Sequence, residues 1–280
     1  MDIKRVLLTG GNGLVGRALA PLLREKYDVT HFEIKAPGDG LPCIEGDLRD
    51  AAAVAHACQG MDAVLHVAAL HGKTWAQAGD DVAFQVNVLS TNNIFEGAAK
   101  AGAQRVVFTS SIYATGHERN APYLPIDEGL PREPAELYGL TKLLGEQMCR
   151  YATSVHGLST IALRPGGISP ADVHAPNVVR YMAGAVDVRD VAQAQMLALE
   201  APADMMHEVF VITADSPLCQ VDPKDYQADP VGTLDKLMPG AAQLVAEGKL
   251  ELSPNMEWYT VDKARRMLGY QPRYNFTIKL

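Results

Sequence analysis

The chain has 280 residues, of which 48% are hydrophobic and 21% charged, as in a globular protein that buries a large core. Its net charge of −8 argues against non-specific binding of nucleic acid or of an anionic membrane surface, and no apolar run is long enough to span a bilayer. The first residues lack the pattern of a signal peptide, and the scattered cysteines and histidines form no metal-ligand motif. We therefore expect a cytoplasmic protein with no metal site.

The chain starts with a short apolar run and a glycine-rich turn, VLLTGGNGLVG (6–16). Gly10, Gly13 and Gly16 recur at intervals of three, and residues 14–26 carry apolar side chains at helical spacing. In a strand–turn–helix unit of this kind, backbone N–H groups approach a pyrophosphate and the helix N-terminus faces it. Tight turns also use glycine for steric reasons alone, so the flanking strand and helix carry the prediction of a dinucleotide site.

A second predicted strand, 28–33, ends at Glu33. A carboxylate at this position can accept hydrogen bonds from both hydroxyls of an adenosine ribose and repels a 2′-phosphate, which favours NAD over NADP. The alternative is an ordinary charged residue at a strand end, and the nearby Lys35 keeps the choice of cofactor open.

Strands and helices alternate through most of the chain. We predict strands at 43–48, 63–68, 105–110, 158–163 and 208–213, and helices at 50–57, 80–102, 138–155 and 189–199. This alternation predicts an α/β fold, a doubly wound parallel sheet of the Rossmann type. Residues 1–165, with 186–213 returning to them, are expected to form the nucleotide-binding domain, and 166–185 with 214–280 a small C-terminal substrate lobe containing two or three helices, notably 261–268.

Tyr138 and Lys142 are four residues apart at the start of a predicted helix, so their side chains share one face. An ammonium about 6 Å from a tyrosine is expected to lower the phenol pKa by roughly two units from its ordinary value of about 10. Tyr138 would then be the general acid/base for a substrate hydroxyl, and Ser111, at the end of a strand, would hydrogen-bond the same oxygen. Because Tyr-x-x-x-Lys pairs are often structural, this prediction depends on the preceding nucleotide-binding turn and the strand-end serine.

These motifs together resemble the extended short-chain dehydrogenase/reductase superfamily, in its NAD-dependent epimerase/dehydratase branch. The matching segments follow the family order over nearly the whole chain: TGGNGLVG (9–16), Glu33, GDL (46–48), HVAA (66–69), Asn87, TSSIYATG (109–116), YGLTK (138–142), RPGG (164–167), VDVRDVA (186–192) and KARRMLGYQPR (263–273). The resemblance implies a Rossmann-type fold, NAD as cofactor and hydride transfer at a carbinol carbon.

The same resemblance implies the contacts to NAD. They come from the glycine turn, strand ends and the Tyr–Lys helix, at Gly10, Asn12, Gly13, Leu14, Val15, Gly16, Glu33, Asp47, Leu48, Ala68, Ala69, Asn87, Tyr138, Lys142, Pro165 and Gly167. Asn87 either lies near the cofactor or holds the strands together. The family also implies a homodimer, in which helices 80–102 and 138–155 of two subunits form a four-helix bundle.

Departures from the family pattern narrow the reaction. Family dehydratases carry Thr-Asp-Glu where this chain has Ser111, Ile112 and Tyr113, so no carboxylate is available there to eliminate water. The short segment between Pro165 and Val186 indicates a reduced substrate lobe and hence a small sugar or hydroxy acid.

Residues 176–190 resemble the corresponding segment of uronate dehydrogenases. This resemblance implies that Arg180 is a clamp for a substrate carboxylate. A surface arginine on a loop is the alternative. The other residues expected to contact the substrate are Ser111, Ile112, Tyr113 and Asn177. Ser169 and His174 are further candidates for hydroxyl contacts, and Asp187 and Asp190 are interpreted as helix caps.

The sequence thus favours an NAD-dependent oxidoreductase acting on a sugar or sugar acid. An NAD-retaining sugar 4-epimerase needs the same three residues, Ser111, Tyr138 and Lys142, and stays open. A non-catalytic NAD-binding regulator is a third possibility, against which the intact set of three residues argues.

Overall fold

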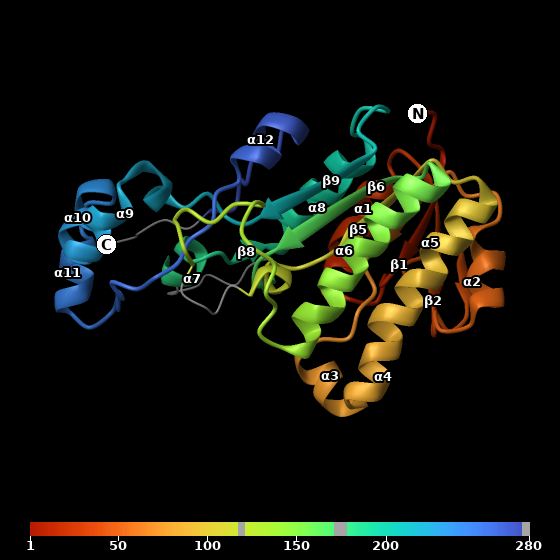
Figure 1. The fold of residues 1–280 in the computed structure, drawn as a ribbon, viewed down its shortest axis with the longest axis horizontal. Coiled ribbons are helices and arrows are strands. Elements are labelled where there is room, and N and C mark those ends of the chain that lie inside the picture. Colours follow the sequence, from red (N-terminus) through yellow and green to blue (C-terminus); the bar gives the residue numbers. More distant parts are fainter. Residues whose placement is uncertain (117–120, 171–177, 276–280) are drawn as a thin grey trace.

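The computed structural model describes residues 1–116, 121–170 and 178–275. Its centre is a parallel sheet with the strand order β3-β2-β1-β4-β5-β6-β9, covered by helices on both faces (Figure 1). The strands are β1 (Arg5–Thr9), β2 (Asp28–Glu33), β3 (Cys43–Glu45), β4 (Ala63–His66), β5 (Arg105–Thr109), β6 (Ser159–Pro165) and β9 (His207–Ile212), and a separate small sheet pairs β7 (Ile168–Ser169) with β8 (Val186–Asp187). The predicted Rossmann-type fold is confirmed.

The helices connect the strands in the expected alternation. They are α1 (Leu14–Leu23), α2 (Ala51–Cys58), α3 (Gly72–Ala78), α4 (Asp80–Phe84), α5 (Ser90–Ala101), α6 (Leu137–His156), α7 (Val178–Met182), α8 (Val188–Leu199), α9 (Pro223–Ala228), α10 (Pro230–Leu237), α11 (Ala241–Ala246) and α12 (Asp262–Leu268). Short 3₁₀ turns lie at Ile112–Thr115 and Pro217–Gln220.

The core has two layers because successive strand residues point to opposite faces of the sheet. Leu8 of β1 packs in one layer with residues of α1, α8 and α12, such as Leu19 and Val191. Its neighbour Leu7 packs in the other layer with residues of α2, α5 and α6, such as Ile94 and Cys149. Both faces of the sheet are therefore buried, as the near-continuous apolar strands require.

Three helical segments differ from the prediction. The helix expected over 80–102 is divided into α4, a π-helical turn at Gln85–Leu89 and α5. Helix α3 was not predicted, because none of its seven residues is buried and it shows no apolar stripe. The last section contains α9–α12, four helices where two or three were expected.

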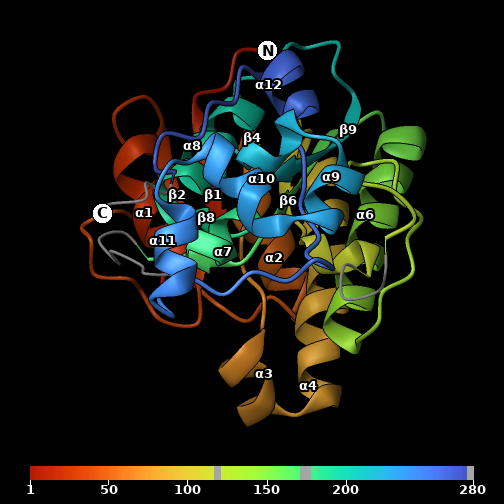
Figure 2. The ribbon, with the colours of Figure 1, turned by 90° about the vertical axis from the view of Figure 1, so that its left-hand side faces the viewer.

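Residues after β9 divide between two places. Helices α9, α10 and α11 lie beyond the carboxyl ends of the strands (Figures 1 and 2) and surround Trp258, whose ring meets Tyr226 edge-on at 5.4 Å between centroids. Helix α12 instead packs on the sheet, where Ala264 and Leu268 join the layer of α1 and α8. The segment around Trp258 therefore has its own small core, whereas α12, which was expected in the C-terminal lobe, packs on the sheet because its apolar side chains meet the layer of α1 and α8.

Within the described part of the chain, no helix is both long and apolar enough to cross a membrane. The same residues contain no group of three or more histidine, cysteine or acidic side chains placed to hold a metal ion.

Candidate active site

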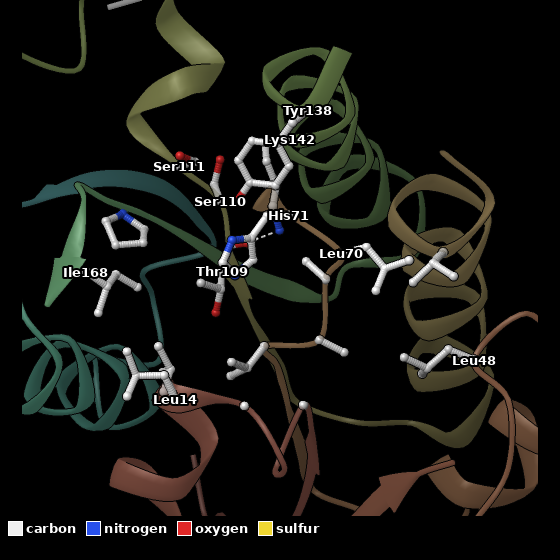
Figure 3. Close-up of a pocket in the computed structure, with 18 of the residues that line it drawn as sticks. Leu14, Leu48, Leu70, His71, Thr109, Ser110, Ser111, Tyr138, Lys142 and Ile168 are labelled. Atoms are coloured by element: carbon white, nitrogen blue, oxygen red, sulfur yellow. Dashed lines mark hydrogen bonds between the residues drawn. The ribbon is translucent and has the colours of Figure 1, made fainter. Parts of the chain in front are cut away.

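A cavity of about 570 Å³ opens at the carboxyl edge of the sheet. It runs from the turn after β1, past the ends of β2 and β4, to the ends of β5 and β6 and the start of α6 (Figure 3). This edge is where open α/β sheets bind their ligands.

The glycine turn closes one end of this cavity. Gly10 has φ +78°, and a Cβ there would lie 2.6 Å from the backbone N of Ala68 at the end of β4. A Cβ on Gly16 would lie 2.2 Å from the carbonyl oxygen of Gly10, so Gly16 lets α1 pack against the turn. Gly13, Leu14 and Val15 line the cavity, whereas Gly16 does not.

Two further residues expected at the cofactor do not line the cavity. Asn12 donates its side-chain amide to the carbonyl of Lys35, at 2.6 Å, and so fastens the turn to the segment after β2. Asn87 accepts a hydrogen bond from the N–H of Leu70 and donates to the Leu70 carbonyl (2.8 and 2.9 Å) and to the hydroxyl of Thr141 (3.2 Å). Of its two predicted roles the structure supports the structural one, in which it joins the segment after β4 to α6.

Acidic side chains lie at the ends of β2 and β3. Glu33 lines the cavity, and its buried Oε1 has no hydrogen-bond partner among the described residues. Asp47 and Leu48 line the cavity next to Arg49, and the Arg49 guanidinium holds the pKa of Asp47 below its ordinary value. An unpartnered buried carboxylate oxygen suits a ribose hydroxyl, which is a hydrogen-bond donor.

Ser111, Tyr138 and Lys142, which we call the Ser–Tyr–Lys group, meet at the other end of the cavity (Figure 3). The Lys142 ammonium is buried, donates to the Thr109 carbonyl at 2.8 Å and lies 5.7 Å from the centroid of the Tyr138 ring. The Ser111 hydroxyl accepts a hydrogen bond from the N–H of Tyr113 at 3.2 Å and acts to lower the pKa of the nearby Tyr138. The helix spacing and the strand-end serine thus bring these side chains together as predicted.

The expected effect of Lys142 on the tyrosine pKa is wrong for this structure. Burial raises the pKa of Tyr138 above its ordinary value, and the Ser111 hydroxyl opposes this rise only in part. Burial also lowers the pKa of Lys142 to about 7. Desolvation dominates because both side chains lie inside the protein, where a charged form loses its hydration.

The expected substrate residues are not all at the cavity. Tyr113 lines it, but Ile112 is buried in a cluster with Ile126 and Val211 and does not face the cavity, contrary to prediction. A 3₁₀ turn has three residues per turn, so neighbouring side chains point in different directions; Ile112 meets the core while Tyr113 faces the cavity. Ser169 is also buried away from the cavity lining.

The remaining candidates lie in or beside the undescribed segment. His174 and Asn177 lie outside the described residues, and Arg180 lies on α7 with a side chain that is not described. Their proposed contacts stay predictions.

The two aspartates interpreted as helix caps behave differently. Asp187 caps α8 by accepting a hydrogen bond from the N–H of Arg189, which confirms the prediction. Asp190 accepts instead from the backbone N–H groups of Arg273 and Tyr274, each at 2.9 Å, so the cap assignment is wrong for it. It fastens the end of the chain to α8, a long-range contact that a local pattern does not reveal.

His71 is a cavity residue that the sequence prediction missed. It follows β4, and its ring centroid lies 6.0 Å from that of Tyr138 (Figure 3). Burial and the Lys142 charge lower its pKa, so its neutral form predominates near pH 7. Its position after a predicted strand was the available signal, but no motif includes it. Other unpredicted lining residues include Phe32, Ile34, Arg49, Leu70, Val82, Val86, Thr109, Ser110 and Ile168.

Comparison with known proteins agrees with the geometry. The model of the NAD dependent epimerase/dehydratase family matches residues 6–177. An L-arabinose 1-dehydrogenase (NAD(P)(+)) of Haloferax volcanii is 32% identical over 60% of this chain and 68% of its own length. A uronate dehydrogenase of Pseudomonas putida is 30% identical over 59% of this chain and 62% of its own length. A short-chain dehydrogenase/reductase superfamily protein of Agrobacterium tumefaciens, solved with bound NAD, superimposes with a TM-score of 0.74 at 25% identity and covers 97% of this chain and 93% of its own.

Proposed function

The chain belongs to the NAD dependent epimerase/dehydratase family, and from this premise we propose that it is a dehydrogenase that oxidises a carbinol carbon of a sugar or sugar acid. The Ser–Tyr–Lys group at one end of a cavity, with the glycine turn at the other, is the observation that carries the proposal. The similarity to an arabinose dehydrogenase and to a uronate dehydrogenase supports the substrate class.

The residues at the glycine-turn end fit NAD. The unpartnered Oε1 of Glu33 suits a ribose hydroxyl and disfavours a 2′-phosphate. Gly10, which has no Cβ, lets the turn lie against the backbone of Ala68 at the edge of the cavity. We assign the cofactor contacts to the predicted residues that line the cavity, namely Gly10, Gly13, Leu14, Val15, Glu33, Asp47, Leu48, Ala68, Ala69, Tyr138, Lys142, Pro165 and Gly167. When bound, NAD supplies the acceptor for the hydride that leaves the carbinol carbon.

The chain's own residues handle the proton. Ser111 holds the reacting oxygen beside Tyr138, and Tyr138 exchanges a proton with it. Because burial raises the Tyr138 pKa, the phenol is the resting form, and it must lose its proton before it can act as a base in the oxidation direction. The Ser111 hydroxyl and the Lys142 ammonium are the groups placed to stabilise the phenolate.

The short connection between β6 and β8 favours a small substrate. The small core around Trp258 lies beyond the strand ends. We propose that residues 166–185 and the helices α9–α11 form the substrate lobe, and that Tyr113, with Asn177 and Arg180, contacts the substrate.

An NAD-retaining sugar 4-epimerase is the second candidate, because it requires the same Ser–Tyr–Lys group and belongs to the same family. A non-catalytic NAD-binding protein has no need of Ser111, Tyr138 and Lys142 together at one end of the cavity, and this arrangement argues against it.

We further propose a homodimer. Helices α5 and α6 lie side by side (Figure 1), and Leu89, Tyr151 and Val155 on this helical layer expose 45%, 55% and 56% of their surface. Pairing this layer with its copy would form a four-helix bundle and cover these apolar side chains. Sedimentation velocity of the wild type and of Tyr151→Glu/Val155→Glu tests this, with a monomeric double variant as the expected result.

A cytoplasmic location of the protein is proposed as well, because its four free cysteines suit a reducing compartment.

The direct test of function is incubation with NAD and a panel of uronic acids, free sugars, nucleotide sugars and a non-sugar secondary alcohol. Net formation of reduced nicotinamide with a sugar or uronate is the expected result. Interconversion of nucleotide sugars without net reduction would instead identify an epimerase, and oxidation of the non-sugar alcohol alone would overturn the substrate class.

A further inference from the structure

A fully buried carboxylate, that of Glu146, lies on α6 one helical turn beyond Lys142. Glu146 follows Tyr138 and Lys142 at intervals of eight and four residues on α6, so the three side chains follow one another along one helical face. Its side chain is 0% exposed, as is that of its ion-pair partner Arg164 at the end of β6. The reaction proposed above makes no use of either residue.

Both oxygens of this carboxylate are bound. Oε1 accepts hydrogen bonds from the hydroxyl of Ser110 and from Nε of Arg164, each at 2.7 Å. Oε2 accepts from Nη2 of Arg164 at 2.8 Å and lies 3.9 Å from Nη1 of Arg132. Nη1 of Arg164 is buried without a hydrogen-bond partner among the described residues. Glu146 is the carboxylate hydrogen-bonded to this guanidinium, and the negative charge of Glu128 acts on it as well.

The two hydrogen-bond partners of Glu146 are each next in sequence to a cavity residue. Ser110 lines the cavity and precedes Ser111, and Arg164 precedes Pro165, which also lines it. Figure 3 shows Ser110 and Ser111 beside Tyr138. The Glu146 carboxylate therefore connects the ends of β5 and β6 to the helix that carries Tyr138.

A buried ion pair is weak evidence for stability, because well-packed apolar side chains often serve equally well in its place. An apolar side chain at position 146, however, could not accept a hydrogen bond from the Ser110 hydroxyl. It would therefore not hold the backbone that leads into Ser111 in one orientation. Displacement of a reacting group by about 1 Å is enough to slow catalysis by roughly 100-fold.

We propose that Glu146 is a positioning residue that holds Ser110 and Arg164 against α6 and thereby fixes Ser111 beside the Tyr138 hydroxyl. The proposal rests on the proposed function in one respect, namely that Ser111 and Tyr138 are the reacting groups.

The test compares Glu146→Gln, which keeps the shape but removes the charge, with Glu96→Gln, which removes the charge of a partly exposed carboxylate paired with Lys100 and His156 and outside the cavity lining. In Glu146→Gln we expect kcat to fall at least tenfold while the Kd for NAD stays within twofold of wild type. Hydrogen–deuterium exchange should quicken in 109–116 and not in β1. Glu96→Gln should match wild type in all three measurements.

Ser110→Ala is the second variant, because it keeps the ion pair between Glu146 and Arg164. We expect it to fold even where Glu146→Gln does not. Its kcat should fall by a smaller factor than that of Glu146→Gln. Unchanged kcat in either folded variant would overturn the proposal, as would a loss of kcat accompanied by an equal loss of NAD binding and by faster exchange throughout the chain.

A wild type that oxidises none of the panel would contradict the proposed function instead. The exchange measurement then decides about Glu146 by itself, and the absence of a local change in 109–116 would overturn its positioning role.

Discussion

The glycine turn and the Ser–Tyr–Lys group line the same cavity but are built in opposite ways. At the turn the decisive feature is the absence of a side chain, because a Cβ on Gly10 would lie 2.6 Å from the backbone of the segment after β4. At the Ser–Tyr–Lys group the decisive features are polar side chains placed out of water, such as the Lys142 ammonium bound to the Thr109 carbonyl. Changes at the turn should therefore affect NAD binding, and changes at the Ser–Tyr–Lys group should affect chemistry and its dependence on pH.

The largest expected effect is that of Tyr138→Phe, which removes only the hydroxyl. We expect kcat to fall about 10³-fold, within the range for loss of a general acid/base, while the Kd for NAD changes little. Steady-state kinetics and fluorescence titration with NAD measure the two quantities. Full activity in this variant would contradict the assignment of Tyr138.

In Gly10→Ala, the clash with the Ala68 backbone and the left-handed conformation each cost roughly 1–2 kcal/mol unless the turn moves. A turn that moves to relieve this cost loses the shape that lines the cavity, so NAD binding should weaken by up to about 100-fold. Gly38→Ala is the matched control, because Gly38 also has φ +78° but a Cβ added there would have no described atom of a non-adjacent residue within 4 Å. The control should lose some stability and keep its affinity for NAD. Equal losses of affinity in both variants would show that strain, rather than space at the turn, determines binding.

Lys142 should make stability depend on pH. Its pKa is lowered from 10.5 to about 7 by burial, so between these values the unfolded chain holds more protons than the folded one. The free energy of unfolding should therefore rise with pH across this window, by at most about 1.4 kcal/mol per pH unit from this group. Urea denaturation at pH 7, 8 and 9 should give a shallower rise for Lys142→Met, and parallel curves would refute the expectation.

The smallest expected effect is that of Glu33→Gln, which keeps the side-chain shape and removes the charge. We expect the Kd for NAD to rise about tenfold and the preference for NAD over NADP to decrease, because a charged acceptor forms the stronger hydrogen bond to a ribose hydroxyl. Glu45→Gln, on the neighbouring strand and outside the cavity lining, is the control. Unaltered affinity for both cofactors in Glu33→Gln would remove Glu33 from the site.

The sequence by itself determined the features that depend on local pattern. The glycine spacing identified the turn at 10–16, the alternation of strands and helices identified the parallel sheet, and the interval from Tyr138 to Lys142 placed both side chains on one helical face. These three predictions succeed because backbone geometry and side-chain direction repeat with a fixed period along the chain.

Only the tertiary structure decided the features that depend on burial and on contacts between distant segments. Asn87 reaches Leu70 and Thr141, Asp190 holds the chain end, and Glu146 joins Ser110 to Arg164. The predicted direction of the Tyr138 pKa shift was wrong for the same reason, because desolvation depends on everything packed around a side chain. A local pattern specifies which way a residue points, and the folded chain specifies what it meets there.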